Sequence, residues 1–146
     1  MSLHLIKLCV GADSLDDLRQ WIAGRMREAN KQGLPPRHAH ITRMVPKRAE
    51  EILAGGSLYW VIKGLISARQ AIIGIDPFIM DADGVRRCRL WLDGEVVAVA
   101  QRKMRAFQGW RYYEPKDAPP DLDHARPGFA EMPEAMRRDL VSLGLL

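Results

Sequence analysis

The chain has 146 residues, of which 47% are hydrophobic and 27% charged, values typical of one soluble globular domain spanning residues 1–146. No apolar run approaches the roughly 20 residues of a membrane span, and no small-residue cleavage site follows the apolar start, so neither a membrane helix nor a signal peptide is expected. The net charge of +4 is uneven, with +6 over residues 37–111 and −3 over residues 112–146. A basic central segment favours nucleic acid, nucleotides or other anions as partners, although ordinary solubility charge would look similar.

The first third of the chain predicts a strand, a long helix, a second strand and a short helix. Residues 3–10 are rich in Leu, Ile and Val, as expected of a largely buried strand. A helix is expected over residues 14–31, with Ser14 starting it in a capping-box-like pattern. The run at 38–44 alternates as a strand does, and Pro46 suits the first turn of a short helix that Gly55 or Gly56 caps. The buried face of the long helix is predicted from its spacing: Leu15, Leu18, Ile22 and Met26.

The remainder reads as strands joined mostly by short turns, followed by a closing helix. Asp93-Gly94 is a strong hairpin signal, and the proline-rich stretch after residue 115 predicts irregular structure. A last helix is expected after Pro133, with Met136, Leu140 and Leu143 on one face. Five runs are expected as strands or extended segments: 57–63, 67–76, 85–92, 95–104 and 107–113. The pattern predicts an α+β fold in which a small, twisted, mostly antiparallel β-barrel is flanked by helices.

The stretch "GGSLYWVIKG" at 55–64 raises the question of what a lysine does in a strand that is otherwise apolar. Alternation over residues 57–63 places Tyr59 and Lys63 on the face opposite Trp60 and Ile62. The next predicted strand begins near Arg69 and Gln70, and a short hairpin would bring those two side chains close to Tyr59 and Lys63. A ring, two cations and an amide on one face suit a phosphate or a base, whereas the alternative is a lysine that extends into solvent at the sheet edge.

Two further clusters could contribute to such a cleft. "TRMVPKR" at 42–48 gathers cations, Arg43 among them, near a predicted helix N-terminus, where anions are favoured. "FQGWRYY" at 107–113 interleaves aromatic residues with Arg111, a composition shared by single-strand nucleic-acid surfaces and by core-closing strands. The expected ligand-binding residues are therefore Arg43, Tyr59, Lys63, Arg69, Gln70, Trp110 and Arg111.

Metal and thiol chemistry have weaker signals. His38 and His40 place two imidazoles on one strand face, but a metal would need further ligands, so neither a metal nor a cofactor is expected. Cys9 and Cys88 both lie in apolar runs and are expected to be buried, reduced thiols of a cytoplasmic protein. Nucleotide-binding glycine loops and the serine-hydrolase elbow are absent from the sequence.

With these motifs in view, the chain resembles an uncharacterised bacterial family catalogued as domain of unknown function 1489. The resemblance runs through "HLIKLCVGADS", "TRMVPKRAEEILAGGSLYWVIKG", "RQAI", "RRC" and "FQGWRYYEPKDAPPDL". The layout of "RAEEILAGGSLYWVIKG" is also similar to the helix–glycine–strand entry of ASCH and PUA-like barrels. That likeness implies a PUA-like barrel, RNA binding and, in some relatives, action on modified nucleosides; the Lys-Thr-Glu spacing of those enzymes is not matched here.

Three functions are consistent with these residues. The first is a cytoplasmic nucleic-acid or nucleotide-binding domain with a basic cleft and with RNA or a nucleotide as partner. The second is a small hydrolase acting on a nucleoside-like or amide substrate, in which Lys63 would work with Glu95 and a hydroxyl. The third is a non-catalytic interaction module whose charges only solvate it.

Overall fold

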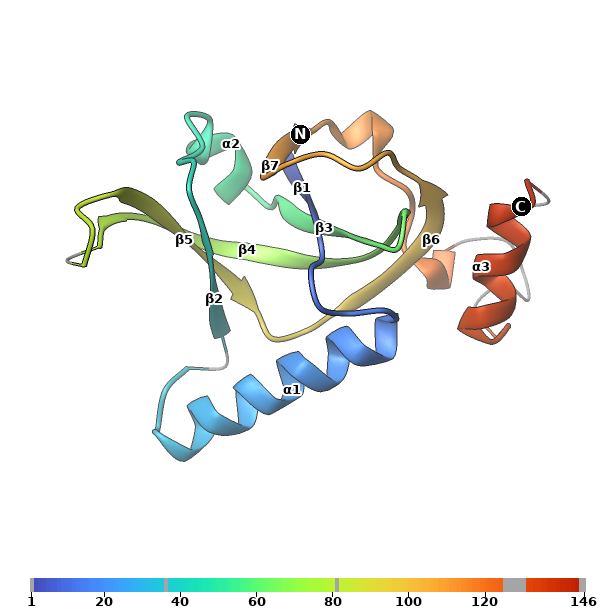
Figure 1. The fold of residues 1–146 in the computed structure, drawn as a ribbon, viewed down its shortest axis with the longest axis horizontal. Coiled ribbons are helices and arrows are strands. Elements are labelled where there is room, and N and C mark those ends of the chain that lie inside the picture. The colour runs from blue at the N-terminus through green and yellow to red at the C-terminus, as the bar shows by residue number, and fades with distance from the viewer. Residues whose placement is uncertain (1, 36, 81, 125–130, 145–146) are drawn as a thin grey trace.

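The computed structural model of this chain describes residues 2–35, 37–80, 82–124 and 131–144 and shows a mixed α/β fold (Figure 1). In these described residues, seven strands form one sheet, and three α-helices and two short 3-10 helices surround it. The strands are β1 (His4–Leu8), β2 (Arg37–Thr42), β3 (Ser57–Ile62), β4 (Leu65–Ile79), β5 (Arg86–Asp93), β6 (Val97–Lys103) and β7 (Trp110–Tyr113). The helices are α1 (Leu15–Lys31), α2 (Ala49–Leu53) and α3 (Glu134–Ser142), with 3-10 turns at Pro115–Asp117 and Leu122–His124.

The order of the strands is β2-β5-β4-β3-β1-β7. The remaining strand, β6, also pairs with β4. All pairings are antiparallel except that of β1 with β3, which is parallel and needs the long crossover through α1, β2 and α2. The 15-residue β4 runs through both halves of the sheet. Its first half pairs with β3 and β6, and its second half pairs with β5.

Each face of the sheet carries an apolar cluster. The larger cluster gathers Leu5, Leu58 and Trp60 with the apolar face of α1, which lies along one end of the sheet (Figure 1). The smaller cluster, on the opposite face, includes Ile6, Tyr59, Val61, Ile66 and Tyr113. Alternation along β1 and β3 therefore supplies both layers, as the period of a strand requires.

The predicted start and buried face of α1 are confirmed. The Ser14 hydroxyl accepts a hydrogen bond from the Asp17 backbone N–H at 3.1 Å, which satisfies one free donor of the first turn. Leu15, Leu18 and Ile22 are buried, and Met26 packs against the same cluster. The left-handed glycine predicted after the short helix is Gly55, with φ +119°.

Other expectations were wrong in detail. The predicted barrel is not closed, because β2 pairs only with β5 and β7 only with β1 in the described part of the chain. The face predicted for the last helix is also wrong: Met136 and Leu143 are 51% and 71% exposed, while Val141 is buried. This short helix packs at the sheet edge through Val141, which contacts Leu65 and Leu122, and that local contact sets its rotation.

The cysteines and the helices also answer expectations from the sequence. Both cysteines are free thiols, Cys88 buried and Cys9 half-buried, which confirms the expected absence of a disulfide between them. Among the described residues, none of the helices combines the length and the apolar character needed to cross a bilayer.

Candidate functional site

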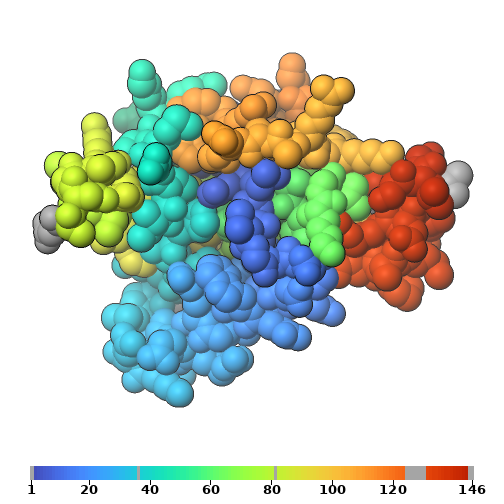
Figure 2. Space-filling model, in the orientation of Figure 1, coloured from blue at the N-terminus to red at the C-terminus, as the bar shows by residue number. Residues whose placement is uncertain are grey.

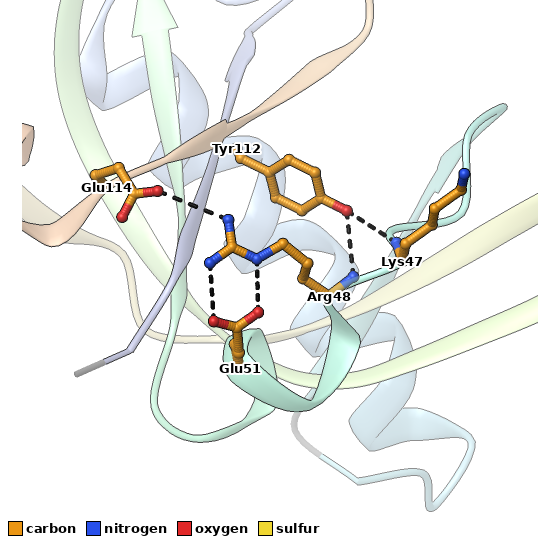
Figure 3. Close-up of polar contacts among 5 residues, drawn as sticks. All are labelled: Lys47, Arg48, Glu51, Tyr112 and Glu114. Atoms are coloured by element: carbon orange, nitrogen blue, oxygen red, sulfur yellow. Dashed lines mark hydrogen bonds and ion pairs between the residues drawn. The ribbon is translucent and has the colours of Figure 1, made fainter.

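The candidate site lies where the sheet stays open, between β2 and the β1–β7 edge. Side-chain contacts bridge this opening in place of a strand ladder. The Trp110 indole N–H donates to the Met44 carbonyl at 2.9 Å. The Tyr112 hydroxyl accepts hydrogen bonds from the backbone N–H groups of Lys47 at 2.8 Å and Arg48 at 3.2 Å (Figure 3). Two cavities lie along this opening.

A first cavity of about 250 Å³ lies between α1, the end of β1, β2 and β3. Trp60, which is 2% exposed, forms part of its wall, and Trp21, which is 49% exposed, stands at its mouth. The Arg25 guanidinium lies 4.4 Å from the centroid of the Trp21 ring, a cation–π contact that leaves a positive charge at the mouth. The lining is mostly apolar: Lys7, Leu8, Cys9, Val10, Gly11, Ala12, Asp17, Leu18, Trp21, His40 and Trp60.

A second cavity, also of about 250 Å³, opens between β1, the end of β2 and the start of β7. Its lining holds two cations, Lys7 and the exposed Arg43, beside the ring of Trp110. The full lining is Lys7, Ile41, Thr42, Arg43, Met44, Gly109 and Trp110. Lys7 therefore lines both cavities.

The position of Lys7 follows from the strand register. It is the direct partner of Trp60 in β3 and of Trp110 in β7. Directly paired residues project from the same face of a sheet, so an indole, an ammonium and a second indole form one row across three strands. Figure 2 shows the face that carries this region, where β1 (dark blue) lies beside β2 (cyan) and above α1. We call Trp60, Lys7 and Trp110 the cross-strand row.

Of the two histidines of β2, His40 lines the first cavity, and His38 lies two residues earlier on the same face of the strand. The His40 ring meets the Trp60 ring edge to face, with 5.1 Å between centroids. Burial lowers the pKa of His40 to about 4, and the charges of Lys7, His38 and Arg25 act in the same direction. The pKa of His38 is also lowered to about 4, first by burial and then by Arg25, although its hydrogen bond with Gln70 opposes the change. Both imidazoles are therefore neutral at pH 7 and add no charge to the cavity wall.

Gln70 fixes the orientation of the cavity wall. It is fully buried and accepts a hydrogen bond from the Trp60 indole N–H at 2.9 Å. Its amide group donates to the Asp93 carbonyl at 2.8 Å and lies 2.9 Å from His38 Nε2. Because a neutral His38 accepts that second hydrogen bond, its own proton sits on Nδ1. All hydrogen-bonding groups of this amide thus serve the structure, and Gln70 is not available to a ligand in the predicted cleft.

The predicted cleft of Tyr59, Lys63 and Arg69 is not formed. Tyr59 and Arg69 do face each other across β3 and β4, but Tyr59 is 4% exposed and sits in the smaller apolar cluster. Arg69 makes two hydrogen bonds of 2.8 Å to the Asp121 carboxylate and a third, of 3.2 Å, to the Ser57 hydroxyl. This half-buried ion pair fastens the segment after β7 to the sheet, so Arg69 has a structural partner where an anion was expected.

Lys63 lies outside the strand. β3 ends at Ile62, and Lys63 and Gly64 form the two-residue turn into β4, both with positive φ, +47° and +78°. Positive φ at both central positions matches a type I′ hairpin turn, which suits the right-handed twist of the strands. The Lys63 ammonium is exposed and lies 3.9 Å from the Asp13 carboxylate, a surface pair that contributes little. The lysine in "GGSLYWVIKG" is therefore a turn residue.

We predict that Lys63→Asn stabilises the protein by about 0.5 kcal/mol, because asparagine adopts the left-handed region at lower cost than lysine. Chemical denaturation of the two proteins measures this difference. Lys116→Asn, at an exposed position in a 3-10 turn, is the control and should not gain stability. A loss of more than 1 kcal/mol in Lys63→Asn would show that the lysine side chain holds the turn.

Of the other expected residues, some reach the opening and one does not. Arg43 and Trp110 both line the second cavity, as described above. Arg111 is exposed, and its guanidinium lies 4.8 Å from the Phe107 ring centroid, so it stacks on a neighbour outside both cavity linings.

Sequence reasoning missed Lys7, Trp21 and the role of Trp60. The signal that could have drawn attention to Lys7 is the one used for Lys63, a lysine within an otherwise apolar strand, here "HLIKLCV".

The residues named for a hydrolase do not come together. Lys63 precedes Leu65, which pairs with Lys103, whereas Glu95 precedes Val97, which pairs with Arg69. The two positions on β4, Leu65 and Arg69, are about 13 Å apart at about 3.3 Å per residue, and Lys63 and Glu95 lie beyond them at opposite ends. Burial raises the pKa of the Cys9 thiol in the first cavity, which disfavours the nucleophilic thiolate. In the part of the chain that the structure describes, no group of three or more His, Cys, Asp or Glu residues is placed to hold a metal.

Comparison with known proteins places the chain in one family. It belongs to the family described as Protein of unknown function (DUF1489), which matches residues 5–146. No curated protein and no solved structure matches it. The site must therefore be interpreted from its own geometry.

Proposed function

We propose that this member of the DUF1489 family is a nucleic-acid or nucleotide-binding domain whose ligand lies along the opening between β2 and the β1–β7 edge. The observation that carries the proposal is the cross-strand row, in which Lys7 stands between Trp60 and Trp110 with a cavity on either side. An ammonium pairs with a phosphate, and the two indoles, which are 2% and 6% exposed, give each cavity an apolar wall that requires no particular base.

The surroundings of the row support this ligand class. Arg43 adds a cation to the second cavity, and the Arg25–Trp21 stack adds a cation and an exposed ring at the mouth of the first. Neutral histidines in the wall leave the positive charge to these side chains. The net charge of +6 over residues 37–111 favours the approach of a polyanion.

Two finer expectations belong to the same proposal. The seven-strand sheet is treated as an open form of a PUA-like barrel, with the ligand at the opening, an analogy of fold only. The free thiols Cys9 and Cys88 are in keeping with a reducing compartment, so the proposal places the domain in the cytoplasm.

Salt-dependent RNA binding tests the proposal. A short, labelled, mixed-sequence RNA is titrated with the protein by fluorescence anisotropy over a series of KCl concentrations. Log Kd should rise with log salt, with a slope of about 0.7 for each phosphate contact on a single strand. Lys7→Met and Arg43→Gln should each weaken binding and each lower that slope by about one contact.

Lys103→Met and Arg27→Gln are the matched controls, since both residues are exposed and lie outside the linings of the first and second cavities. These variants should bind as the parent does. Affinity that does not depend on salt, or Lys7→Met and Arg43→Gln proteins that bind as tightly as the parent, would remove the proposal. In that case the third expectation, an interaction module, becomes the better interpretation.

A further inference from the structure

We infer that one ligand occupies both cavities together, so that the unit recognised is a step of two nucleotides in an unstacked single strand. This rests on the proposed function and adds a definite geometry to it. One base lies in the first cavity against Trp60, the next lies in the second cavity against Trp110, and the phosphodiester between them lies at Lys7.

The rings of Trp60 and Trp110 are too far apart for two stacked bases. Trp60 and Trp110 are on strands that flank β1 on opposite sides, and neighbouring strands are about 4.8 Å apart. The two indoles therefore project from backbone positions about 10 Å apart. Stacked bases are about 3.4 Å apart along a strand. Two successive bases can reach both rings only when they are splayed apart, which a duplex does not allow.

The volume of each cavity suits one base. Each cavity has about 250 Å³, just below the roughly 300–1,000 Å³ typical of pockets that enclose a drug-sized ligand. Each is thus suited to one small planar group. A ligand of two linked bases would fill the pair, and Lys7 is the one residue common to both linings.

The charges that line the two cavities favour the phosphate on the side of the second cavity. The first cavity is lined by the Asp17 carboxylate, which accepts a hydrogen bond from the Asp13 backbone N–H at the start of α1. That carboxylate repels a phosphate, whereas Lys7 and Arg43 attract one on the side of the second cavity. The backbone of the ligand is therefore directed to Lys7 and Arg43, and the first cavity receives an uncharged base.

Binding of UMP and of the dinucleotide UpU distinguishes this geometry from a single subsite. UpU carries less negative charge than UMP, so tighter binding of UpU must come from its second nucleoside. We expect UpU to bind at least about tenfold more tightly, in keeping with the stacking of one added base. TpT, measured against TMP in the same way, shows whether the step is read in RNA or DNA, and a gain in either pair supports the inference.

Two variants assign the cavities. Trp21 lines only the first cavity and Arg43 only the second, and both side chains are exposed, so Trp21→Ala and Arg43→Gln should remain folded by thermal melting. Each should weaken UpU binding about three- to tenfold. The double variant should bind UpU no better than the parent binds UMP. Arg27→Gln, exposed on α1 and outside both linings, should leave all affinities unchanged.

The outcomes separate the inference from the proposed function. If the mixed-sequence RNA binds with the expected salt dependence but each dinucleotide binds no more tightly than its mononucleotide, the two-nucleotide step is wrong and the binding function stands. If an RNA duplex binds as tightly as the single strand, the splayed geometry is likewise wrong. If neither the mixed-sequence RNA nor UpU binds at all, both fail.

Discussion

Replacing Gln70 by leucine is expected to lower the free energy of unfolding by about 4 kcal/mol. Leucine fills a similar volume, but it leaves two buried groups, the Trp60 indole N–H and His38 Nε2, without their hydrogen bonds, and it also removes the bond to the partly buried Asp93 carbonyl. Each such loss costs about 1–3 kcal/mol when the group stays away from water. Urea denaturation of the variant and the parent measures the difference.

Gln101→Leu is the matched control. The Gln101 side-chain oxygen is buried and has no hydrogen-bond partner among the described residues. Removing that oxygen should leave stability unchanged or raise it slightly, because an unsatisfied polar atom is replaced by an apolar one. If Gln70→Leu costs less than 1 kcal/mol, the amide does not hold the cavity wall, and the fixed orientation of Trp60 loses its explanation.

Lowering the pH from 7 to 4 is expected to destabilise the protein by about 6 kcal/mol through His38 and His40. Each has a pKa of about 4 in the folded chain, against about 6.5 in the unfolded chain. Between these values the unfolded state binds more protons, so stability is fully present above pH 6.5 and falls as the pH drops toward 4. Burial also lowers the pKa of His4, and this histidine contributes in the same direction.

The measurement is the free energy of unfolding from urea denaturation at a series of pH values. His40→Gln should reduce the slope between pH 6.5 and 4 by about one proton, because one titrating group is removed from the unfolded state. Gln20→Ala, at an exposed residue of α1 that does not titrate, is the control and should keep the slope of the parent. NMR titration gives an independent check: an imidazole of His40 that titrates near pH 6.5 in the folded protein would contradict this prediction.

Local sequence was sufficient wherever neighbouring residues decide the structure. The period of α1 identified Leu15, Leu18 and Ile22 as buried, and Ser14 as its cap. Alternation and turn residues located the strands from residue 57 to residue 104 approximately. The incorrect placement of Lys63 in a strand has a local cause too. The Lys63-Gly64 pair follows directly on an apolar strand, and only its two positive φ values show that it is a turn.

The last helix shows where local reasoning stops. Its apolar positions are few, and its buried face depends on contacts with other elements. Val141 packs against the leucines at 65 and 122, and the Arg138 guanidinium donates to the Ile62 carbonyl. In a short helix, a few apolar residues do not define which side is buried. The surface against which the helix packs determines its rotation. For this reason Met136 and Leu143 are exposed although the spacing predicted otherwise.

The sequence by itself determined the buried face of this protein's longest helix and most of its strand segments, because each depends on residues within a few positions of one another. Only the tertiary structure decided the site. Lys7, Trp60 and Trp110 are far apart in the chain, and they form one row only because β1 inserts between β3 and β7 in a particular register. Periodicity reports which residues share a face of one strand, whereas the pairing of distant strands is set by how the whole sheet packs over its core. The opening that holds both cavities arises in the same way, from two edges that the fold brings close and does not pair.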